Sequence, residues 1–383
     1  MTEYRYGMSD TEIVTIETIP VSLPLRPDSE PGGVAPYIGN AERLTETKRL
    51  IVRLELACGV TGWGEMWPEA AYGTRATDTI LREEIAPQII GMEAWETESV
   101  TELFEREYVD ARAFVGAIEM AMWDAYGTYL DVPLYELLGG KTTDYVSFAY
   151  LVGIFDEDRS RMHVRRAIDR GFDVLKVKGS ADWKNDVRRL KAMHDEADGR
   201  LDFRLDPNQG WSPEDAVRAL ATLEDNGIYL QYIEQPIRVD TPETLVTLRN
   251  RVRTPIAINE DTYRPRSLSK LCQRGAIDAA VVDLVPSGGI TALRRLAGVA
   301  MEFDVSLAHH NAFDLGIKTA AITHVVASTP GFTAASDTVY DGIADDIIEN
   351  PLSVTDGTIS IPDGAGLGVS VDETKLSKYR IDE

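Results

Sequence analysis

Seven ionisable residues close short β-type runs at nearly even spacing through the second half of the chain. Successive members are 23 to 28 residues apart, the length of one strand followed by one helix. Because the carboxyl ends of parallel barrel strands meet at one mouth, such residues would converge on a single site there. Each one alone could be an ordinary charge at a strand end, but the repeated spacing favours a shared function. The seven are Lys178, Asp206, Glu234, Glu260, Asp283, His310 and Asp337.

Three consecutive members of this series are carboxylates with no histidine or cysteine nearby. Asp206, Glu234 and Glu260 would lie on three adjacent strands. A donor set made only of oxygens suits a hard ion, Mg²⁺ above all. The alternative is three solvated acids in an acidic protein. Each of them, however, lies beside apolar strand residues, where like charges repel one another unless a cation is present. We therefore predict that they are ligands of Mg²⁺.

Two lysines are candidates for an acid–base role. Lys176 and Lys178 lie two residues apart in the run DVLKVKG, so alternation places both on one face of a strand. A solvated sheet edge is the alternative, but a barrel strand has no free edge. Two neighbouring ammonium groups disfavour each other's protonation and lower a pKa, which would make one of them a base near neutral pH. Lys178 is nearer the mouth and is the better candidate.

An aspartate and a histidine close two neighbouring strands on the other side of the predicted barrel. A carboxylate such as Asp283 that is hydrogen-bonded to the imidazole of His310 would orient the ring and favour its protonated form. His309 is a rival, because adjacent strand residues face opposite ways and an error of one residue would exchange them. With a divalent ion to stabilise an enediolate, lysine and histidine on opposite sides would move the proton α to a carboxylate.

The elements that must position these residues fall into two parts. The first part mixes strands, such as EIVTIETIPVSLPL and the pair in KRLIVRLELACGVTGWGE, with helical patterns from about Thr77 to Leu138, which predicts an α+β domain. From Tyr145 onward, eight strand-like runs alternate with amphipathic helices, which favours a closed α/β barrel, a TIM barrel, over an open sheet. The runs are YVSFAYLV, DVLKVKG, LDFRLDP, YIEQP, PIAINE, DAAVVDL, DVSLAHH and FTAASDT.

Composition excludes several classes of protein. The 383 residues include 63 Asp and Glu against 39 Lys and Arg, a formal net charge of −24. Nucleic acids and anionic membranes both need clustered basic residues, so neither is an expected partner. Ten lysines against 29 arginines in so acidic a chain favour a halophilic protein over an ordinary acidic one. Cys58 and Cys272 form no disulfide or zinc pattern, and no signal peptide or membrane span is evident, so we expect a cytoplasmic protein.

Several motifs carry a resemblance to a known family. In chain order they are FVGAIEMAMWDAYGTYLDVPLYELLGG, KVKG, DPNQGW, IEQP, DLVPSGGIT and PDGAGLGV. They resemble, in turn, the end of the capping domain, the paired-lysine strand, two metal strands, the sixth strand and the C-terminal return segment of the enolase superfamily. Within that superfamily the chain is similar to the mandelate racemase and muconate lactonizing enzyme family, over nearly its whole length.

The resemblance implies a modified (β/α)7β TIM barrel, a Mg²⁺ cofactor and a small carboxylic acid substrate that loses its α-proton. It implies an α+β capping domain over residues 1–140, a catalytic barrel over 141–350 and a segment over 351–383 that returns to the cap. Barrels with such caps commonly associate, so we expect a homo-oligomer. By similarity, the metal ligands are Asp206, Glu234 and Glu260, and Lys178, supported by Lys176, works opposite the Asp283–His310 dyad.

Three positions bear on the branch of the family. The muconate-lactonizing type carries a base lysine five residues before Gly288, where this chain has Asp283, so the racemase and sugar-acid dehydratase types are favoured. Glu260 matches the third metal ligand of racemase-type enzymes, whereas Asn259 stands where muconate-type enzymes have an aspartate. Asp337, if protonated, would hydrogen-bond the substrate carboxylate or the developing oxyanion.

These residues suit two reactions. Our first hypothesis is dehydration of a sugar acid to a 2-keto-3-deoxy acid, because HHNAFDL and FTAASDT look similar to glucarate dehydratases. The second is a racemase or epimerase of an α-substituted carboxylic acid. A non-catalytic binding protein would have a broken set of residues, and a Schiff-base aldolase would leave the three carboxylates unexplained. Pro24–Asn40 and Trp63–Tyr72 are candidates to close over the substrate, with Arg26 and Tyr37 as possible contacts.

Overall fold

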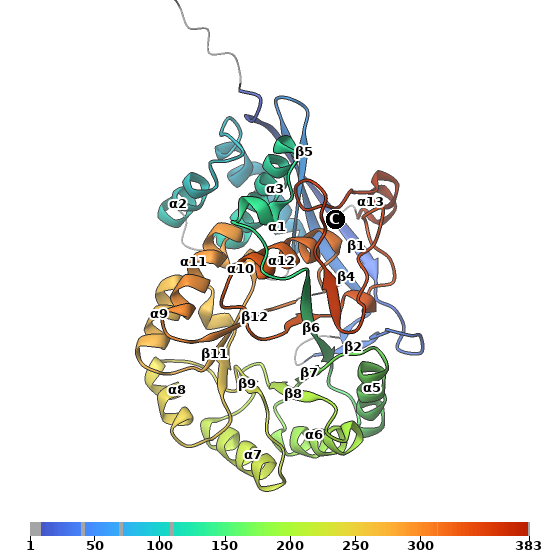
Figure 1. Cartoon of the computed structure of the whole chain (residues 1–383), viewed down its shortest axis with the longest axis vertical. Coiled ribbons are helices and arrows are strands. Elements are labelled where there is room, and N and C mark those ends of the chain that lie inside the picture. Colours follow the sequence, from blue (N-terminus) through green and yellow to red (C-terminus); the bar gives the residue numbers. More distant parts are fainter. Residues whose placement is uncertain (1–8, 40–42, 69–71, 108–110, 312, 382–383) are drawn as a thin grey trace, which may run out of the picture.

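The structure, a computed structural model, describes residues 9–39, 43–68, 72–107, 111–311 and 313–381. It consists of a cap of strands and helices above a barrel of parallel strands surrounded by helices (Figure 1). The end of the chain lies beside the cap in the same view. The predicted α/β fold, a TIM barrel with an N-terminal α+β cap, is confirmed.

The cap is built on an antiparallel sheet with strand order β1-β4-β5. The hairpin between β4 and β5 turns at Cys58 and Gly59, and the φ of +85° at Gly59 is one that glycine adopts without strain. The cap strands are β1 (Ile13–Pro24), β2 (Tyr37–Ile38), β3 (Arg43–Leu44), β4 (Glu46–Leu56) and β5 (Thr61–Met66). The cap helices are α1 (Thr74–Ile80), a π-helical turn (Leu81–Ile85), a 3-10 turn (Ala86–Gln88), α2 (Thr97–Glu107), α3 (Arg112–Leu130) and α4 (Leu134–Leu137).

All eight predicted barrel strands are present, paired in parallel in the order β12-β11-β10-β9-β8-β7-β6-β13. The ring nearly closes between β12 and β13, where the Leu307 amide donates to Gly331 O at 3.0 Å and Leu307 O accepts from the Ala334 amide at 3.1 Å. The strands are β6 (Tyr145–Val152), β7 (Val174–Lys178), β8 (Asp202–Asp206), β9 (Tyr232–Glu234), β10 (Ile256–Ile258), β11 (Ala279–Val282), β12 (Ser306–His309) and β13 (Ser336–Thr338).

A helical segment follows each of the first seven barrel strands, which makes the barrel (β/α)7β. The helix over Trp183–Ala197 is typical: its first free amides are capped by the side chain of Asp182. The barrel helices are α5 (Glu157–Asp169), α6 (Trp183–Ala197), α7 (Pro213–Asp225), α8 (Pro242–Arg249), a 3-10 turn (Glu260–Thr262), α9 (Pro265–Gln273), α10 (Leu284–Ser287), α11 (Ile290–Met301), α12 (Gly316–Ser328) and a 3-10 turn (Tyr340–Gly342).

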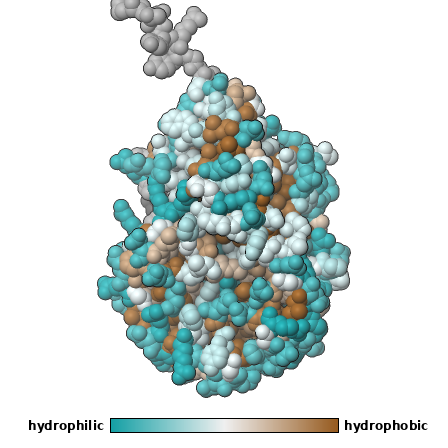
Figure 2. All heavy atoms as spheres, in the orientation of Figure 1, coloured by the Kyte–Doolittle hydropathy of each residue, from teal (hydrophilic) through white to brown (hydrophobic). Residues whose placement is uncertain are grey.

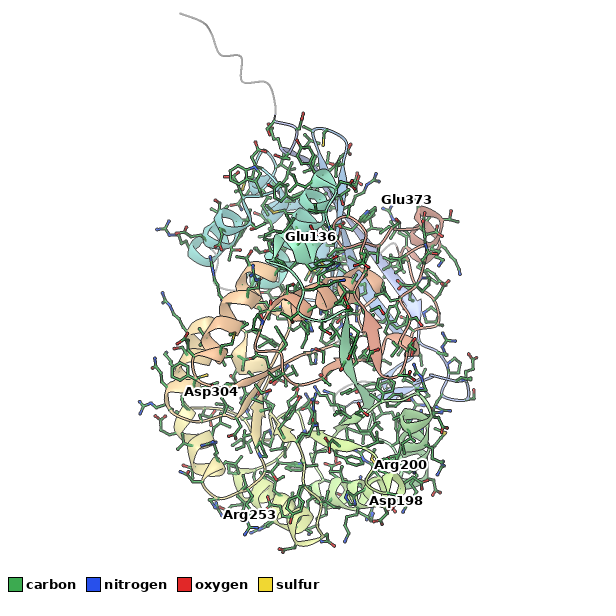
Figure 3. The ribbon with its side chains drawn as sticks, viewed as in Figure 1. Glu136, Asp198, Arg200, Arg253, Asp304 and Glu373 are labelled. Carbon is green, nitrogen blue, oxygen red and sulfur yellow. The ribbon has the colours of Figure 1, made fainter. Side chains whose placement is uncertain are left out.

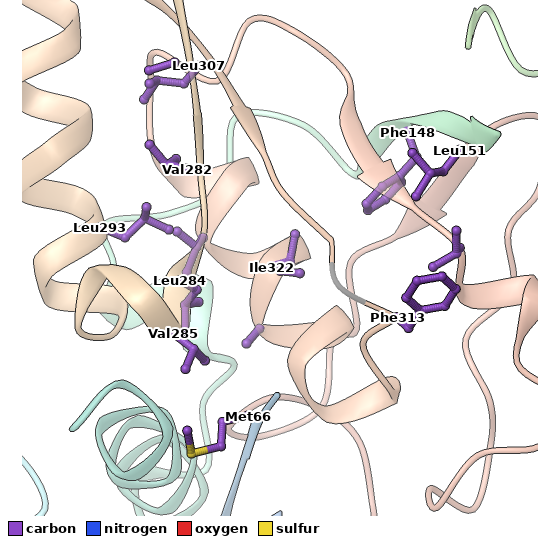
Figure 4. Packing of buried hydrophobic residues seen from close by; sticks show 14 of the residues in the cluster. Met66, Phe148, Leu151, Val282, Leu284, Val285, Leu293, Leu307, Phe313 and Ile322 are labelled. Carbon is purple, nitrogen blue, oxygen red and sulfur yellow. The ribbon is translucent and has the colours of Figure 1, made fainter. Parts of the chain in front are cut away.

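The apolar core has two regions. The larger one fills the space between the strands and the surrounding helices and continues into the cap; Figure 4 shows part of it, with Leu293 of α11 and Ile322 of α12 beside β11 and β12. The smaller one lies inside the barrel, where short side chains from β10, β11 and β12 pack around Tyr232. Its members are Tyr232, Ala257, Ala279, Val281 and Ala308.

The cap and the barrel are in close contact where α3 crosses α10. A Cβ built on Gly116 of α3 would lie 2.6 Å from the backbone oxygen of Val285 in α10, so only glycine allows this approach. Figure 4 shows Met66 of the cap facing Val285 across the same junction. Nearby, Glu119 of α3 accepts hydrogen bonds from the amides of Ile290 and Thr291 at 2.8 and 3.0 Å, at the start of α11. The cap is therefore attached to the helices that follow β11.

The segment after residue 350 contacts both parts. Its strand β14 (Thr358–Ser360) pairs antiparallel with the start of β6 in the barrel. Farther on, the Leu367 amide donates to Asp124 of α3 at 2.7 Å, and α13 (Glu373–Tyr379) lies against β1. The division of the chain into three units at 140 and 350 stays a prediction.

The surface is predominantly hydrophilic in the view of Figure 2. The charged residues labelled in Figure 3, among them Asp198, Arg200 and Asp304, are exposed. Adaptation to high salt remains a prediction from composition. No helix among the described residues has both the length and the apolar character needed to cross a membrane.

Candidate active site at the barrel mouth

The structure brings the predicted carboxylates and lysines together at the carboxyl ends of four adjacent strands, β7 to β10. Lys178, Asp206 and Glu234 are the last residues of β7, β8 and β9. The sequence predicts Glu260 at the end of the fifth strand. This prediction is wrong by two residues, because β10 ends at Ile258 and Glu260 begins a 3-10 turn. Glu260 is exposed to solvent, whereas Asp206 and Glu234 are buried.

Lys178 is held by β8. Its Nζ lies 2.6 Å from Asp206 Oδ2 and donates to Asn208 Oδ1 at 3.0 Å. Burial alone would lower the pKa of Lys178, but Asp206 outweighs burial and the repulsion of Lys176, so the pKa lies above its ordinary value. The sequence argument that the paired lysines lower each other's pKa is therefore wrong for this arrangement, because the neighbouring carboxylates outweigh the second ammonium group.

Lys176 lies one layer deeper in the barrel than Lys178. Its Nζ lies 2.8 Å from Glu234, 2.7 Å from Asp337 Oδ2 and 3.8 Å from Asp206 Oδ2, and the side chain is 1% exposed. On β6, Asp337 pairs with Ala149, and Lys176 pairs with Leu151, two residues farther along the strand. Asp337 is itself buried. The structure thus places Asp337 below the mouth as a counter-ion of Lys176. The sequence instead predicts that Asp337 hydrogen-bonds the substrate.

Asn259 and Glu260 were the alternatives for the third ligand. The side chain of Asn259 is fully engaged: its amide nitrogen donates to Val281 O at 3.0 Å, and its oxygen accepts from Tyr263 OH at 2.8 Å. Glu260, in contrast, faces the mouth. Its side chain reaches solvent at the mouth, but partial desolvation by the surrounding protein and the charge of Asp206 still raise its pKa, against the opposing charges of Lys178 and His310. The geometry therefore favours Glu260.

The donor chemistry of the mouth fits a divalent cation. Burial raises the pKa of Glu234 to about 8; the nearby Asp206 and Asp337 carboxylates add to this effect, and Lys176 opposes it. Three carboxylates, two at the ends of adjacent strands and one in the turn after the next strand, are oxygen ligands of the kind Mg²⁺ uses. In this structure lysine ammonium groups pair with Asp206 and Glu234, and within the described ranges no three His, Cys, Asp or Glu side chains are grouped as an ion would require.

The Asp283–His310 pair lies across the mouth from Lys178. Asp283 directly follows β11, His310 directly follows β12, and His310 Nδ1 lies 3.2 Å from Asp283 Oδ2. His309 faces the opposite way: it is fully buried, and its Nε2 accepts a hydrogen bond from the Leu284 amide at 3.0 Å. Burial lowers the pKa of His309 to about 4, so it stays neutral at physiological pH. Of the two histidines, the structure places His310 in the mouth.

A second cation on the same carboxylate went unnoticed in the sequence. Lys318 of α12 is buried, and its Nζ lies 2.9 Å from Asp283 Oδ1 and 3.1 Å from Asp314 Oδ1. Burial opposes the charge of Lys318, but Asp283 and Asp314 raise its pKa above the ordinary value. The sequence does contain a signal for this ion pair. Lys318 is a lone lysine in the apolar segment GIKTAAITHVVAS of α12, and a lysine buried in such a helix needs a carboxylate partner.

The cap loop after β1 reaches the mouth. Tyr37 packs edge-on against Phe313, with ring centroids 4.8 Å apart, and its hydroxyl acts electrostatically on Lys178. Arg26 instead holds the loop to the barrel, donating to the backbone oxygens of Asp341 and Ile343 at 3.1 and 3.3 Å. Asn40 and residues 69–71 of the two segments expected to cover the substrate lie outside the described residues.

Comparison with known protein families agrees with this fold. Residues 159–375 match the family described as enolase C-terminal domain-like, and residues 34–139 match the mandelate racemase / muconate lactonizing enzyme N-terminal domain. A capped TIM barrel with carboxylates on successive strands and a lysine opposite an Asp–His pair defines an enzyme of the enolase superfamily. Within that superfamily, the chain belongs to the mandelate racemase and muconate lactonizing enzyme family.

Three similar proteins illustrate the range of the family. The solved structure of an isomerase from Streptomyces coelicolor has a TM-score of 0.83 and 31% identity, covering 96% of this chain and 98% of that one. L-Ala-D/L-Glu epimerase of Bacillus subtilis is 25% identical over 94% of this chain and 96% of its own length. A Streptomyces coelicolor protein named "Probable glucarate dehydratase" is 28% identical over 86% of this chain and 84% of its own length.

Proposed function

We propose that this protein removes the proton α to the carboxylate of a small organic acid, in a Mg²⁺-dependent reaction that passes through an enediolate. The observation that carries the proposal is the pair of acid–base groups on opposite sides of the mouth. Lys178 extends from β7, and the Asp283–His310 pair follows β11 and β12. A planar enediolate between them would have one proton-transfer group at each face.

The metal would be held by Asp206, Glu234 and Glu260. When bound there, Mg²⁺ would neutralise these carboxylates, lower the pKa of Lys178 and stabilise the negative charge that develops on the substrate carboxylate. Lys176 remains anchored to Asp337, 2.7 Å away, and this anchor keeps a buried positive charge under the site. In this arrangement Lys178 is the base and Lys176 supports it.

Dehydration of a sugar acid is our first candidate reaction. Lys178 takes the α-proton, and the electron pair of the C–H bond forms the enediolate. As the carboxylate re-forms, the bond between the β-carbon and its hydroxyl breaks, and the imidazolium of His310 gives its proton to the leaving oxygen, releasing water. The resulting enol tautomerises to a 2-keto-3-deoxy acid. The matched glucarate dehydratase supports this candidate.

Epimerisation is the second candidate, and the matched isomerase and epimerase favour it. Here the same enediolate forms, no bond to oxygen breaks, and His310 returns a proton to the opposite face of the α-carbon. The position of Lys178 and His310 on opposite sides supports both reactions, since each reaction needs one proton transfer at each face.

The test is a screen of sugar acids and α-substituted carboxylic acids with Mg²⁺ in D₂O. Formation of a 2-keto acid identifies dehydration. Deuterium at the α-carbon with inversion and without keto acid identifies epimerisation. No exchange with any acid, in low or high salt, would refute proton abstraction.

Two variants test the assigned groups. Lys178→Met and His310→Asn should each lower turnover by roughly 10²–10⁴-fold, the usual contribution of a general acid or base. His194→Asn on the outer helix α6 is the matched control and should keep full activity. Full activity in Lys178→Met would refute its role as the base.

A further inference from the structure

Lys318 is a buried cation that touches the dyad from outside the mouth. It is the one Lys, Arg, Asp or Glu in α12, and its side chain is 2% exposed. Its Nζ lies 2.9 and 3.1 Å from the two oxygens of Asp283 and 3.1 Å from Asp314 Oδ1. A buried ammonium group with two carboxylates at this distance is held firmly in place.

Lys318 shares the Asp283 carboxylate with His310. Oδ2 of Asp283 receives both Lys318 Nζ at 3.1 Å and His310 Nδ1 at 3.2 Å. Oδ1 also accepts the Val285 amide at 3.1 Å, so the carboxylate is fixed in its plane as well as in position. The orientation of the His310 imidazole therefore depends on the ammonium group of Lys318, which lies in helix α12 and does not face the substrate.

The same cation is connected to the cap. Arg49 of β4 lies 3.8 Å from Asp314 Oδ1 and 3.3 Å from Glu65 of β5. Glu65 accepts the backbone amides of Leu315 and Lys318 at 2.7 and 2.9 Å, at the start of α12. A continuous buried chain of charges thus runs from the cap sheet to the dyad, and it fixes the end of α12 from which Lys318 extends.

We propose that Lys318 is a positioning residue for the Asp283–His310 dyad: its ammonium group fixes the Asp283 carboxylate beneath the imidazole and limits the formation of imidazolium. The inference rests on the proposed function, in which His310 transfers a proton. The fixed ammonium group of Lys318 beside Asp283 competes with protonated His310 for the negative charge of the Asp283 carboxylate. Three other ionisable groups interact with this pair: His309 beside it, Tyr263, whose pKa is raised by burial and by the charge of Asp283, and Glu260, which follows the neighbouring strand β10.

The direct test is a histidine titration by NMR, which needs no substrate. The chain has five histidines, and His310→Asn identifies the signal of His310. In Lys318→Met, whose side chain has a similar length and no charge, the midpoint of the His310 signal should rise by roughly one pH unit or more relative to the parent protein. Lys378→Met on α13, where the lysine lies 3.4 Å from Asp345 at the surface, is the control and should leave the midpoint unchanged.

Two further variants guard against misfolding. Lys318→Met with Asp314→Asn removes one positive and one negative charge, so it keeps the charge of the buried cluster balanced, and should show the same upward shift. Lys318→Arg keeps the charge and should restore the midpoint. An unshifted midpoint in folded Lys318→Met, or in the double variant, overturns the proposal.

Activity gives a second, separable readout. With an acid that exchanges its α-proton, Lys318→Met should lower kcat by roughly 10- to 100-fold and leave KM nearly unchanged, because Lys318 does not reach the mouth. An unchanged kcat overturns the proposal even if proton exchange is observed. A shifted NMR midpoint in a protein that exchanges no acid supports the positioning role and refutes the proposed function instead.

Discussion

Asp28 ties the cap loop to helix α5 of the barrel, and its removal is a sharp test of the structure. Its carboxylate lies 2.9 Å from Arg166 and 3.2 Å from His163, and also pairs with Arg159; all three are on α5. The backbone oxygen of Asp28 accepts from Arg166 as well. The same loop carries Tyr37 to the mouth, so Asp28 controls how this side of the site is covered.

The magnitude follows from the pKa of Asp28. Burial alone would raise it, but His163 and then Arg159 lower it from 3.8 to about 2. Lowering the pKa from 3.8 to about 2 corresponds to about 2 kcal/mol of stabilisation by the ionised carboxylate. Because the folded-state pKa is lower than the unfolded one, this stabilisation is complete above about pH 4 and is lost as the pH falls toward 2.

Asp28→Asn should therefore lower the free energy of opening of the loop by about 2 kcal/mol at pH 7. Hydrogen–deuterium exchange of a peptide spanning residues 24–39 measures this opening, and exchange of its protected amides should become roughly 30-fold faster. At pH 2.5 the difference between parent and variant should shrink, since Asp28 is then partly protonated in both states of the parent.

The control is Glu196→Gln, which removes a carboxylate that also pairs with arginines of α5 but from the exposed side, at 2.9 Å from Arg165. It should leave exchange of the loop unchanged, because exposed ion pairs contribute little. Equal exchange rates in the parent and Asp28→Asn would refute the idea that Asp28 holds the loop.

Three further results are expected. Glu260→Gln should raise the Kd for Mg²⁺ by roughly 10-fold or more in calorimetric titration. Asn259→Ala should lower the midpoint of urea unfolding and leave the affinity for Mg²⁺ unchanged. The reverse pattern would assign the ligand role to Asn259. Gly116→Ala should destabilise the protein by about 1–3 kcal/mol, because its Cβ would lie 2.6 Å from a carbonyl oxygen of α10. Gly298→Ala, with open space around it on α11, should instead stabilise by about 0.5–1 kcal/mol, and similar effects of the two would contradict the cap–barrel contact. Lys176→Met should destabilise the protein more than Lys178→Met, since it leaves buried Glu234 and Asp337 without their shared cation, and urea unfolding measures both.

The sequence was sufficient for the architecture of the barrel. Strand runs of alternating or β-branched residues and amphipathic helices are local patterns, and their repeated spacing specified eight strands with helices between them. The convergence of Lys178, Asp206 and Glu234 followed from the same spacing, because parallel strands end at one edge. Boundaries were less certain: Glu260 was assigned to a strand that ends two residues earlier, since a short 3-10 turn has no clear local signal.

The charge states and partners of the site depended on the tertiary structure. Alternation along one strand could not choose between His309 and His310, and the contact that places His310 on Asp283 comes from a neighbouring strand. The paired lysines were expected to lower each other's pKa, but carboxylates from β8, β9 and β13 reverse the direction.

Sequence alone thus determined the residue types and their order around the barrel, because both follow from local periodicity. Only the tertiary structure decided which charges meet. Lys318, far from Asp283 in the chain, approaches it because Glu65 of the cap holds the start of α12, and electrostatic effects depend on such distances through space.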